Sequence, residues 1–119
     1  MGRKRIRFIP KESKKLKYLY FIKVYFKGRD ILKFGISNNY VRRFTEYNNS
    51  ETVGYLKDIF HVYKCNYPKR IETMLKWWMS QYAKPIFKYE YFPLEEYPKI
   101  HKKAKQFARL LGMELVKII

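Results

Sequence analysis

The residue types best suited to chemistry lie between positions 18 and 47. Tyr20 belongs to a Tyr-Leu-Tyr run, and Lys33 begins a Lys-Phe-Gly-Ile-Ser run. Arg43 lies eight residues after the glycine of that second run, and Tyr47 follows four residues later, so both share one face of a helix. Phenols, an amine and a guanidinium can bind a phosphate and position a water molecule. The stretch therefore predicts chemistry on a phosphate ester.

A carboxylate that could hold a metal ion lies further along the chain. Glu72 falls on a helix predicted between Pro68 and Pro85, roughly 90° around from the centre of its apolar stripe. One carboxylate can bind Mg²⁺, or Mn²⁺ in its place, when phosphate oxygens and waters complete the coordination. The alternative is an ordinary salt bridge from Glu72 to Lys76, four residues on, at a solvated helix face.

The overall charge indicates a polyanionic partner. Lys and Arg number 27 against 10 Asp and Glu, which gives a formal net charge of +17 in 119 residues. Because 47% of the residues are hydrophobic and 19% aromatic, we expect one folded domain rather than a disordered basic tail. DNA is the expected partner, with RNA as the alternative.

The remaining composition predicts where the protein acts. The single cysteine, Cys65, cannot form an internal disulfide, and no apolar run reaches the roughly 18 residues of a membrane span. The N-terminus lacks the apolar core of a signal peptide. We therefore expect a protein that acts in the cytoplasm, is not secreted and binds no membrane.

Two groups of cations are candidates for contacts with nucleic-acid phosphates. A basic arm over residues 1–17 contains eight Lys and Arg, and its alternative interpretations are a solvated tail or a localisation signal. The other group lies on the outer faces of two predicted helices. The candidate contacts are Arg3, Lys4, Arg5, Arg42, Lys102, Lys103 and Arg109.

The elements that must position these residues follow from apolar periodicity and turn residues. The predicted strands cover residues 18–26, 31–37, 57–65 and 87–92. The predicted helices lie between caps at 37–39 and 48–50, between Pro68 and Pro85, and between Pro98 and Gly112. The first helix follows the second strand directly, so its first turns are expected to face the hairpin.

This order, β-β-α-β-α-β-α, predicts an α/β fold of the α+β sandwich type. A small, mostly antiparallel sheet of three to four strands should be flanked by three helices. Residues 18–92 should form the body of the domain, with residues 1–17 as an arm and residues 93–119 as a basic helix and tail packed on the same body.

Three further residues favour structural interpretations. His61 and His101 are isolated in the sequence and lack metal-ligand spacing, so each is expected to be structural or exposed. Trp77 falls outside the apolar stripe of its helix and should be exposed, with base stacking as the alternative.

In order and spacing, the first two runs resemble the motifs of the GIY-YIG nuclease superfamily. Tyr20 matches the Tyr of the first motif, with leucine and tyrosine before it in place of Ile and Gly. Phe-Gly-Ile-Ser at 34–37 is similar to the end of the second motif, with Lys33 in place of its Tyr. A lysine at this place resembles the viral and phage-type branch of the superfamily.

The resemblance continues into two predicted helices and covers about residues 18–92. Arg43 and Tyr47 match the Arg and the following His or Tyr of the family's first helix. Glu72 matches the metal-binding Glu of a later helix. The family's late Asn is missing, and Glu90 is a candidate for a related place.

The resemblance implies a metal-dependent endonuclease that hydrolyses DNA phosphodiester bonds by a one-metal mechanism. In that mechanism Glu72 holds Mg²⁺ or Mn²⁺, Arg43 binds the scissile phosphate, and Tyr47 positions the phosphate or the water. Tyr20 is then the general base, and cations such as Lys33 would have to lower its pKa from about 10.

Two alternatives stay open. One is a catalytically inactive DNA- or RNA-binding module on the same scaffold, and the other is a basic RNA-associated protein whose motifs match by chance. The chain is too short for a separate recognition domain, so modest sequence specificity, or help from a dimer or partner protein, is expected. Homing, restriction and repair enzymes all use such domains.

Overall fold

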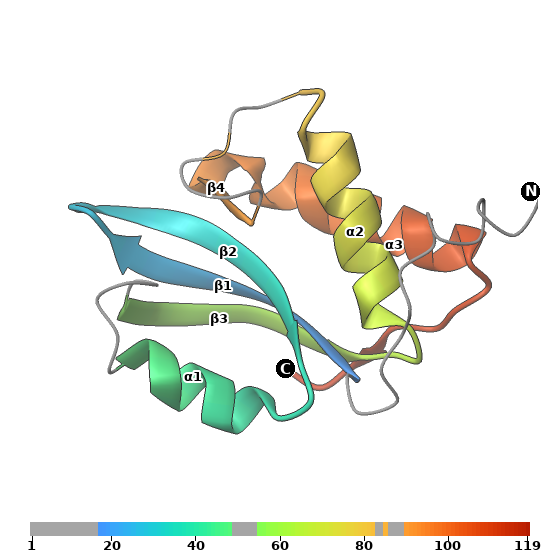
Figure 1. Cartoon of the computed structure of the whole chain (residues 1–119), viewed down its shortest axis with the longest axis horizontal. Helices are drawn as coiled ribbons and strands as arrows, with labels where there is room; N and C mark the ends of the chain where they lie inside the picture. The colour runs from blue at the N-terminus through green and yellow to red at the C-terminus, as the bar shows by residue number, and fades with distance from the viewer. Residues whose placement is uncertain (1–16, 49–54, 83–84, 86–89) are drawn as a thin grey trace, which may run out of the picture.

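One antiparallel sheet of five strands organises the fold, in the order β4-β2-β1-β3-β5 (Figure 1). The computed structural model describes residues 17–48, 55–82, 85 and 90–119. Its elements are β1 (Tyr18–Phe26), β2 (Arg29–Ser37), α1 (Tyr40–Asn48), β3 (Tyr55–Lys64), α2 (Pro68–Met79), β4 (Tyr91–Pro93), the 3-10 turn η2 (Leu94–Glu96), α3 (Tyr97–Leu110) and β5 (Val116–Lys117). The predicted α+β sandwich is confirmed.

β1 and β2 form a hairpin with a two-residue turn at Lys27 and Gly28. Both residues have positive φ angles, 48° and 87°, as required by the type I′ turns that suit the twist of a two-stranded ribbon. Gly28 adopts this conformation without steric cost. The turn is shorter than predicted, since β2 begins at Arg29, and the resulting register pairs Tyr20 with Gly35.

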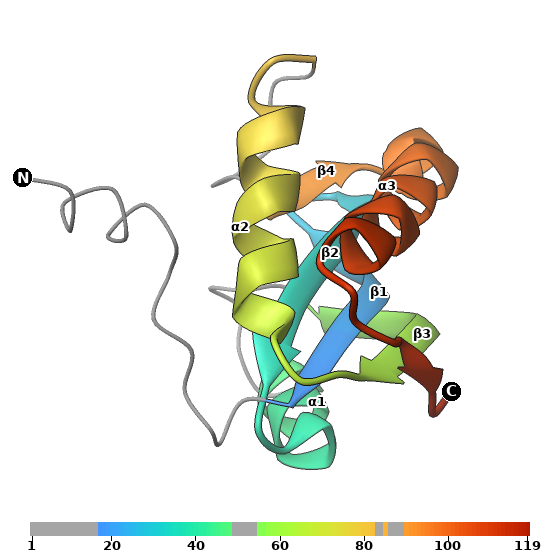
Figure 2. The ribbon, with the colours of Figure 1, turned by 90° about the vertical axis from the view of Figure 1, so that its right-hand side faces the viewer.

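Alternation along β1 gives the sheet two buried faces. Leu19 and Phe21 belong to the core shared with α2 and α3, whereas Tyr20 and Ile22 belong to the core shared with α1. Figures 1 and 2 show α1 on one side of the sheet and α2 with α3 on the other. The side chain of Tyr20 therefore lies on the face that α1 covers.

The outermost strands of the sheet are short. β4 pairs with β2 over Ile31 to Lys33, and β5 pairs with β3 at Tyr63 and Lys64. The predicted count of three to four strands is too low because β5, with two exposed residues, has no alternation to recognise. The predicted strand at 87–92 is found as β4, three residues long, and positions 86–89 fall outside the described residues.

The three helices lie where the sequence predicts them, with corrections at two ends. α2 buries Ile71 and Leu75 as predicted but stops at Met79. Tyr82, which falls within the range predicted for this helix, is therefore 63% exposed beyond the last turn. Leu111, within the range predicted for the last helix, is likewise exposed because it follows the end of α3.

One prediction about the described surface is confirmed. Trp77 is exposed on α2, as its place outside the apolar stripe predicts. None of the described helices is long and apolar enough to cross a lipid bilayer. The predicted basic arm falls outside the described residues except for Lys17, and so do the candidate contacts Arg3, Lys4 and Arg5.

Candidate active site

Tyr20 and Gly35 are partners across β1 and β2. A Cβ atom at position 35 would lie 2.5 Å from the phenol oxygen of Tyr20, a separation that real Cβ atoms do not show. The glycine therefore provides the space in which the buried Tyr20 ring lies. This close approach of the two strands' residues explains why position 35 is a glycine.

Two polar residues start α1 directly after β2. The Ser37 hydroxyl accepts a hydrogen bond from the Asn39 N–H at 3.0 Å, and the Asn39 side chain accepts one from the Arg42 N–H at 3.1 Å. Asn39 is therefore the N-cap, within the predicted 37–39. This start directs the helix face of Arg43 and Tyr47 toward the hairpin.

Tyr20, Tyr47 and Arg43 form the first half of the site. The phenol oxygens of Tyr20 and Tyr47 lie 3.2 Å apart and share a hydrogen bond. The Arg43 guanidinium lies 5.4 Å from the Tyr47 ring centroid and hydrogen-bonds the Tyr20 hydroxyl. Arg43 is 39% exposed and also pairs with Glu46 at 3.7 Å. Two buried phenols thus hold a guanidinium at the surface.

Burial raises the pKa of both phenols. At Tyr20, desolvation outweighs the lowering of the pKa by hydrogen bonds to Tyr47 and Arg43. The pKa of Tyr47 is raised because burial and the neighbouring Tyr20 both disfavour its phenolate. The shift that a general-base role for Tyr20 requires therefore has the opposite sign, and both phenols stay protonated at neutral pH.

Lys33 begins the second half of the site, and only 3% of its side chain is exposed. Its ammonium contacts the Glu90 carboxylate and lies 4.9 Å from the centroid of the Tyr91 ring. Backbone pairing sets this geometry, because Lys33 is opposite Tyr91 in the β2–β4 ladder and the Phe34 N–H donates to the Glu90 carbonyl at 3.2 Å. The buried lysine thus has its counter-ion beside the neighbouring strand.

Burial lowers the pKa of Lys33 to about 8, against the opposing effect of Glu90. Burial of Glu90 would by itself raise the pKa of that carboxyl, but Lys33 and Lys76 hold it below the ordinary value. Lys33 therefore titrates close to neutral pH, in contrast to the two phenols.

Glu72 contributes a buried carboxylate from α2. Its Oε1 atom lies 3.7 Å from the Lys69 ammonium and 3.6 Å from the Lys76 ammonium. The Lys76 ammonium also lies 3.6 Å from Glu90 Oε1, so it stands between two carboxylates. The alternative salt bridge from Glu72 to Lys76 does form, but Glu72 is buried and not on a solvated face.

The two halves of the site meet at Tyr91. Its hydroxyl is hydrogen-bonded to Tyr47, and its ring contacts the Lys33 ammonium. The charge of the adjacent Glu90 also acts on the Tyr20 phenol. The network therefore connects the residues that the sequence selects on β1, β2, α1 and α2: Tyr20, Lys33, Arg43, Tyr47 and Glu72.

Lys76 and Tyr91 of the network escape selection by the motifs, and Glu90 is selected only as a candidate for the place of the missing Asn. Lys76 has a visible signal, since it is the i+4 partner of Glu72. Glu90 is one of only 10 acidic residues in a basic chain, which already makes it a candidate. Nothing in the sequence separates Tyr91 from the other members of a set of 12 tyrosines.

Glu72 and Glu90 are the carboxylates of this site that could hold a divalent cation. Within the described ranges, no group of three or more His, Cys, Asp or Glu side chains is arranged to hold a metal ion. Mg²⁺ often binds through one or two carboxylates with phosphate oxygens and waters. The Lys76 ammonium lies 3.6 Å from an oxygen of each carboxylate, and its side chain is 33% exposed. The two carboxylates are donors of the kind that Mg²⁺ prefers, and the Lys76 ammonium pairs with both of them.

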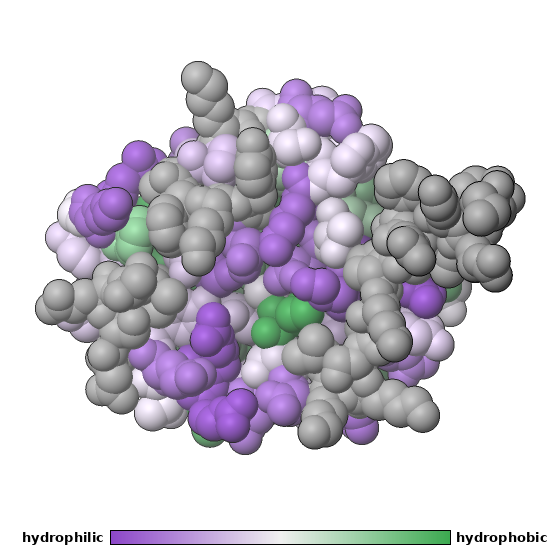
Figure 3. All heavy atoms as spheres, in the orientation of Figure 1, coloured by the Kyte–Doolittle hydropathy of each residue, from purple (hydrophilic) through white to green (hydrophobic). Residues whose placement is uncertain are grey.

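The predicted phosphate contacts outside the arm differ in their surroundings. Arg42 and Lys102 are exposed on α1 and α3, and Arg109 is exposed near the end of α3. Lys103 is predicted to face outward, but its ammonium lies 5.0 Å from the Trp78 ring, so helix packing engages it. Figure 3 shows hydrophilic side chains across the middle of the face that Figure 1 presents, between α1 and α2.

The network combines phenols, a guanidinium, an amine and carboxylates at one place on the sheet. Such groups can bind a phosphate and move a proton, which is the chemistry that the motifs predict. The resemblance to the GIY-YIG superfamily stays a prediction from those motifs, because no protein-family model, no curated protein and no solved structure matches the chain.

Proposed function

We propose that this protein is a metal-dependent endonuclease that hydrolyses DNA phosphodiester bonds by a one-metal mechanism. The main support is that motif residues from four separate elements join one contact network with a partly exposed guanidinium. The net charge of +17 supports a polyanionic substrate. The proposed place of action is the cytoplasm, on DNA.

Arg43 is the phosphate-binding group of the proposed mechanism. Its guanidinium is a planar fork that reaches the surface, and Tyr20 and Tyr47 hold it in place. Burial keeps both phenols protonated, so they hold the guanidinium through neutral hydroxyls. Both tyrosines thus position Arg43 for the phosphate, and neither removes a proton.

Lys33 replaces Tyr20 as the proposed general base. Burial lowers the pKa of Lys33 to about 8, so some neutral amine is present near neutral pH. That amine can accept a proton from the attacking water, and the Glu90 carboxylate beside it stabilises the ammonium that results.

Glu72 and Glu90 are the proposed holders of Mg²⁺ or Mn²⁺. When bound, the ion supplies Lewis-acid stabilisation of the phosphoryl oxygens and of the leaving oxygen. The Lys76 ammonium must first leave its place between the two carboxylates. Its flexible four-carbon stem and partial exposure allow that movement.

Cleavage of supercoiled plasmid by the purified chain in Mg²⁺ or Mn²⁺ tests this function. Wild type should nick the plasmid, and Glu72→Ala should lower the rate roughly a hundredfold or more. The control Glu95→Ala removes an exposed carboxylate and should cut like wild type. If wild type binds the plasmid without nicking it, the nuclease proposal is wrong. If Glu72→Ala cuts as fast as wild type, the metal site is assigned to the wrong residue.

One observation favours a second candidate, a DNA- or RNA-binding module without catalysis. Lys76 already places a positive charge between the two carboxylates, so the charge network needs no metal ion. Such a module would bind DNA or RNA equally well in EDTA and in Mg²⁺, and would cut neither. A dimer or a partner protein would extend its short recognition surface.

A further inference from the structure

A groove lies toward the opposite edge of the sheet from Lys33 and Glu90 of the candidate active site. It has a volume of about 750 Å³, and the C-terminal half of α3, residues 112–115, β5 and one residue of β3 line it. Figure 2 turns the end of α3 and the C-terminus toward the viewer. In the strand order the groove lies at β3 and β5, whereas Lys33 and Glu90 lie beside β2 and β4.

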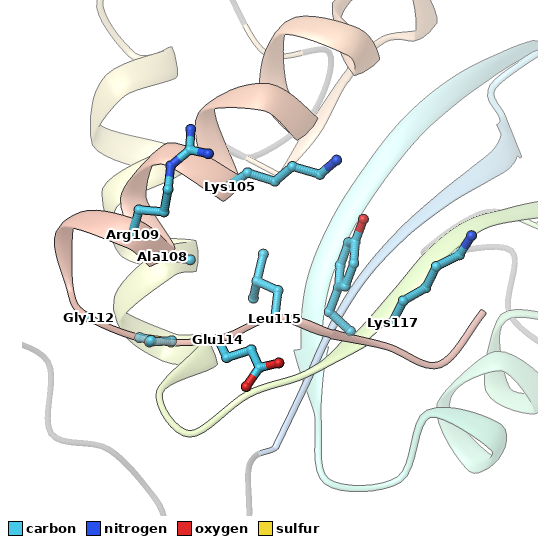
Figure 4. A pocket seen from close by; sticks show the side chains of 9 residues that line it. Lys105, Ala108, Arg109, Gly112, Glu114, Leu115 and Lys117 are labelled. Carbon is cyan, nitrogen blue, oxygen red and sulfur yellow. The ribbon is translucent and has the colours of Figure 1, made fainter.

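Three cations, here called the rim cations, border this groove: Lys105 and Arg109 of α3 and Lys117 of β5 (Figure 4). Lys105 and Arg109 are four residues apart and therefore share one face of α3. All three are exposed, and no carboxylate of the described residues lies within salt-bridge distance of them. Glu114 also lines the groove, but Figure 4 shows its carboxylate directed away from Lys105 and Arg109.

The floor of the groove is apolar. It contains Ala108, Met113 and Leu115, together with Tyr63 from β3. Ala108, Met113 and Tyr63 are buried, so the floor belongs to the ordered core of the domain. A basic rim over an apolar floor suits nucleotides, because each of them joins an anionic phosphate to a flat base.

Four stacked rings adjoin the groove, because Tyr63 belongs both to its lining and to the stack. The His61 and His101 rings lie 4.5 Å apart, and the hydroxyls of Tyr97 and Tyr63 contact them at 2.5 Å and 2.6 Å, respectively. Burial lowers the pKa of His101 to about 4, and burial with the nearby lysines lowers the pKa of His61. Two histidines that look isolated in the sequence thus form a neutral support, and the rim cations supply the positive charge.

We propose that this groove binds single-stranded nucleic acid, with phosphates on the rim cations and bases against the apolar floor. Unstacked bases can reach such a floor, whereas a duplex keeps its bases stacked inside and offers only phosphates to the rim. The groove shares a nucleic-acid ligand with the proposed function but needs no cleavage. It would hold a strand near β3 and β5, whereas Lys33 and Glu90 lie beside β2 and β4.

Fluorescence anisotropy with a labelled oligothymidylate of about 12 nucleotides, in EDTA, measures this binding. The groove variant Lys105→Glu/Lys117→Glu should weaken binding about tenfold or more and reduce the salt dependence of log Kd by roughly 0.7 for each lost phosphate contact. The control variant Arg29→Glu/Lys57→Glu makes the same change in net charge at exposed positions away from the groove. It should weaken binding less than about threefold.

Equal losses of affinity in the groove and control variants would overturn the proposal, because net charge alone would then explain binding. Tighter binding of a hairpin duplex than of oligothymidylate to wild type would also overturn it, provided that the groove variant weakens duplex binding by the same factor as oligothymidylate binding. The neutral pair Lys105→Gln/Lys117→Gln, checked by circular dichroism, separates loss of binding from unfolding. Because the assay contains no divalent ion, groove binding and plasmid cleavage succeed or fail separately.

Discussion

The two charged regions of this protein are built in opposite ways. In the candidate active site the charges are buried or half-buried and paired, with Lys33 against Glu90 and Lys76 between Glu90 and Glu72. In the groove the rim cations are exposed, without a carboxylate partner among the described residues. Paired charges can hold a reacting group in one position, whereas unpaired charges attract a polyanion and release its counterions.

Removal of one charge should destabilise the protein much more in the candidate active site than in the groove. Glu90→Ala leaves the Lys33 ammonium buried without its counter-ion and should lower the free energy of unfolding by roughly 3 kcal/mol. Lys105→Ala, at the exposed rim, should change it by less than about 0.5 kcal/mol. Urea unfolding at pH 7 measures both values. Adding Lys33→Met to Glu90→Ala should recover most of the loss, and a double variant as unstable as the single one would contradict the pairing.

A methyl group at position 35 should damage the candidate active site and leave the groove intact. Gly35→Ala places its Cβ atom 2.5 Å from the phenol oxygen of Tyr20, so the ring must move away from Tyr47. The cost should be about 1–3 kcal/mol in thermal unfolding, with unchanged binding of oligothymidylate. The control Gly28→Asn adds atoms where nothing lies within 4 Å, in a left-handed conformation that asparagine tolerates. Equal losses of stability in Gly35→Ala and Gly28→Asn would contradict the crowding at Gly35.

Titration of Lys33 should give the candidate active site a pH dependence that the groove lacks. The pKa of Lys33 is about 8 in the folded protein against 10.5 ordinarily, so between these values the unfolded chain binds more protons. The free energy of unfolding should therefore rise with pH across that interval, while below pH 8 the penalty for the buried ammonium is present in full. Cleavage should rise about tenfold per pH unit up to about 8 and then level off.

Urea unfolding from pH 7 to 10, for wild type and for Lys33→Met, isolates this effect. The difference between the two proteins should change with pH only where Lys33 titrates. Parallel curves for the two proteins would mean that Lys33 keeps its ordinary pKa and cannot be the base.

The features that the sequence predicts correctly each follow a local rule. The i, i+4 spacing places Arg43 and Tyr47 on one helix face, and the cap at Asn39 starts that helix at the right residue. Glu72 is buried because it borders the apolar stripe of its own helix. Each of these results depends on residues within one or two turns of one another.

The features that the sequence does not predict depend on distant partners. Glu90 meets Lys33 because a three-residue strand pairs with β2, and His61 meets His101 because α3 packs over β3. The pKa of Tyr20 depends on the depth of its burial, which outweighs the cations expected to lower it. Pairing across the sheet and desolvation are properties of the whole fold, and no local spacing encodes them.

Lys76 offers the prediction with the smallest effect. Lys76→Met removes the ammonium between Glu72 and Glu90 and keeps most of the side chain's length. If the two carboxylates bind a cation, the loss of this ammonium should raise the affinity for Mn²⁺ about fivefold. That factor corresponds to roughly 1 kcal/mol, the energy between two unit charges about 4 Å apart in water. Isothermal titration calorimetry without DNA measures this affinity.

The matched control is Lys69→Met, because the Lys69 ammonium pairs with Glu72 and with no other carboxylate of the described residues. It should raise the affinity for Mn²⁺ less than Lys76→Met does, since its charge neighbours one ligand instead of two. An affinity that Lys76→Met leaves unchanged would make Lys76 a fixed part of the charge network. The candidate active site would then be a paired charge network without a cation site, and the binding module would be the better account of both regions.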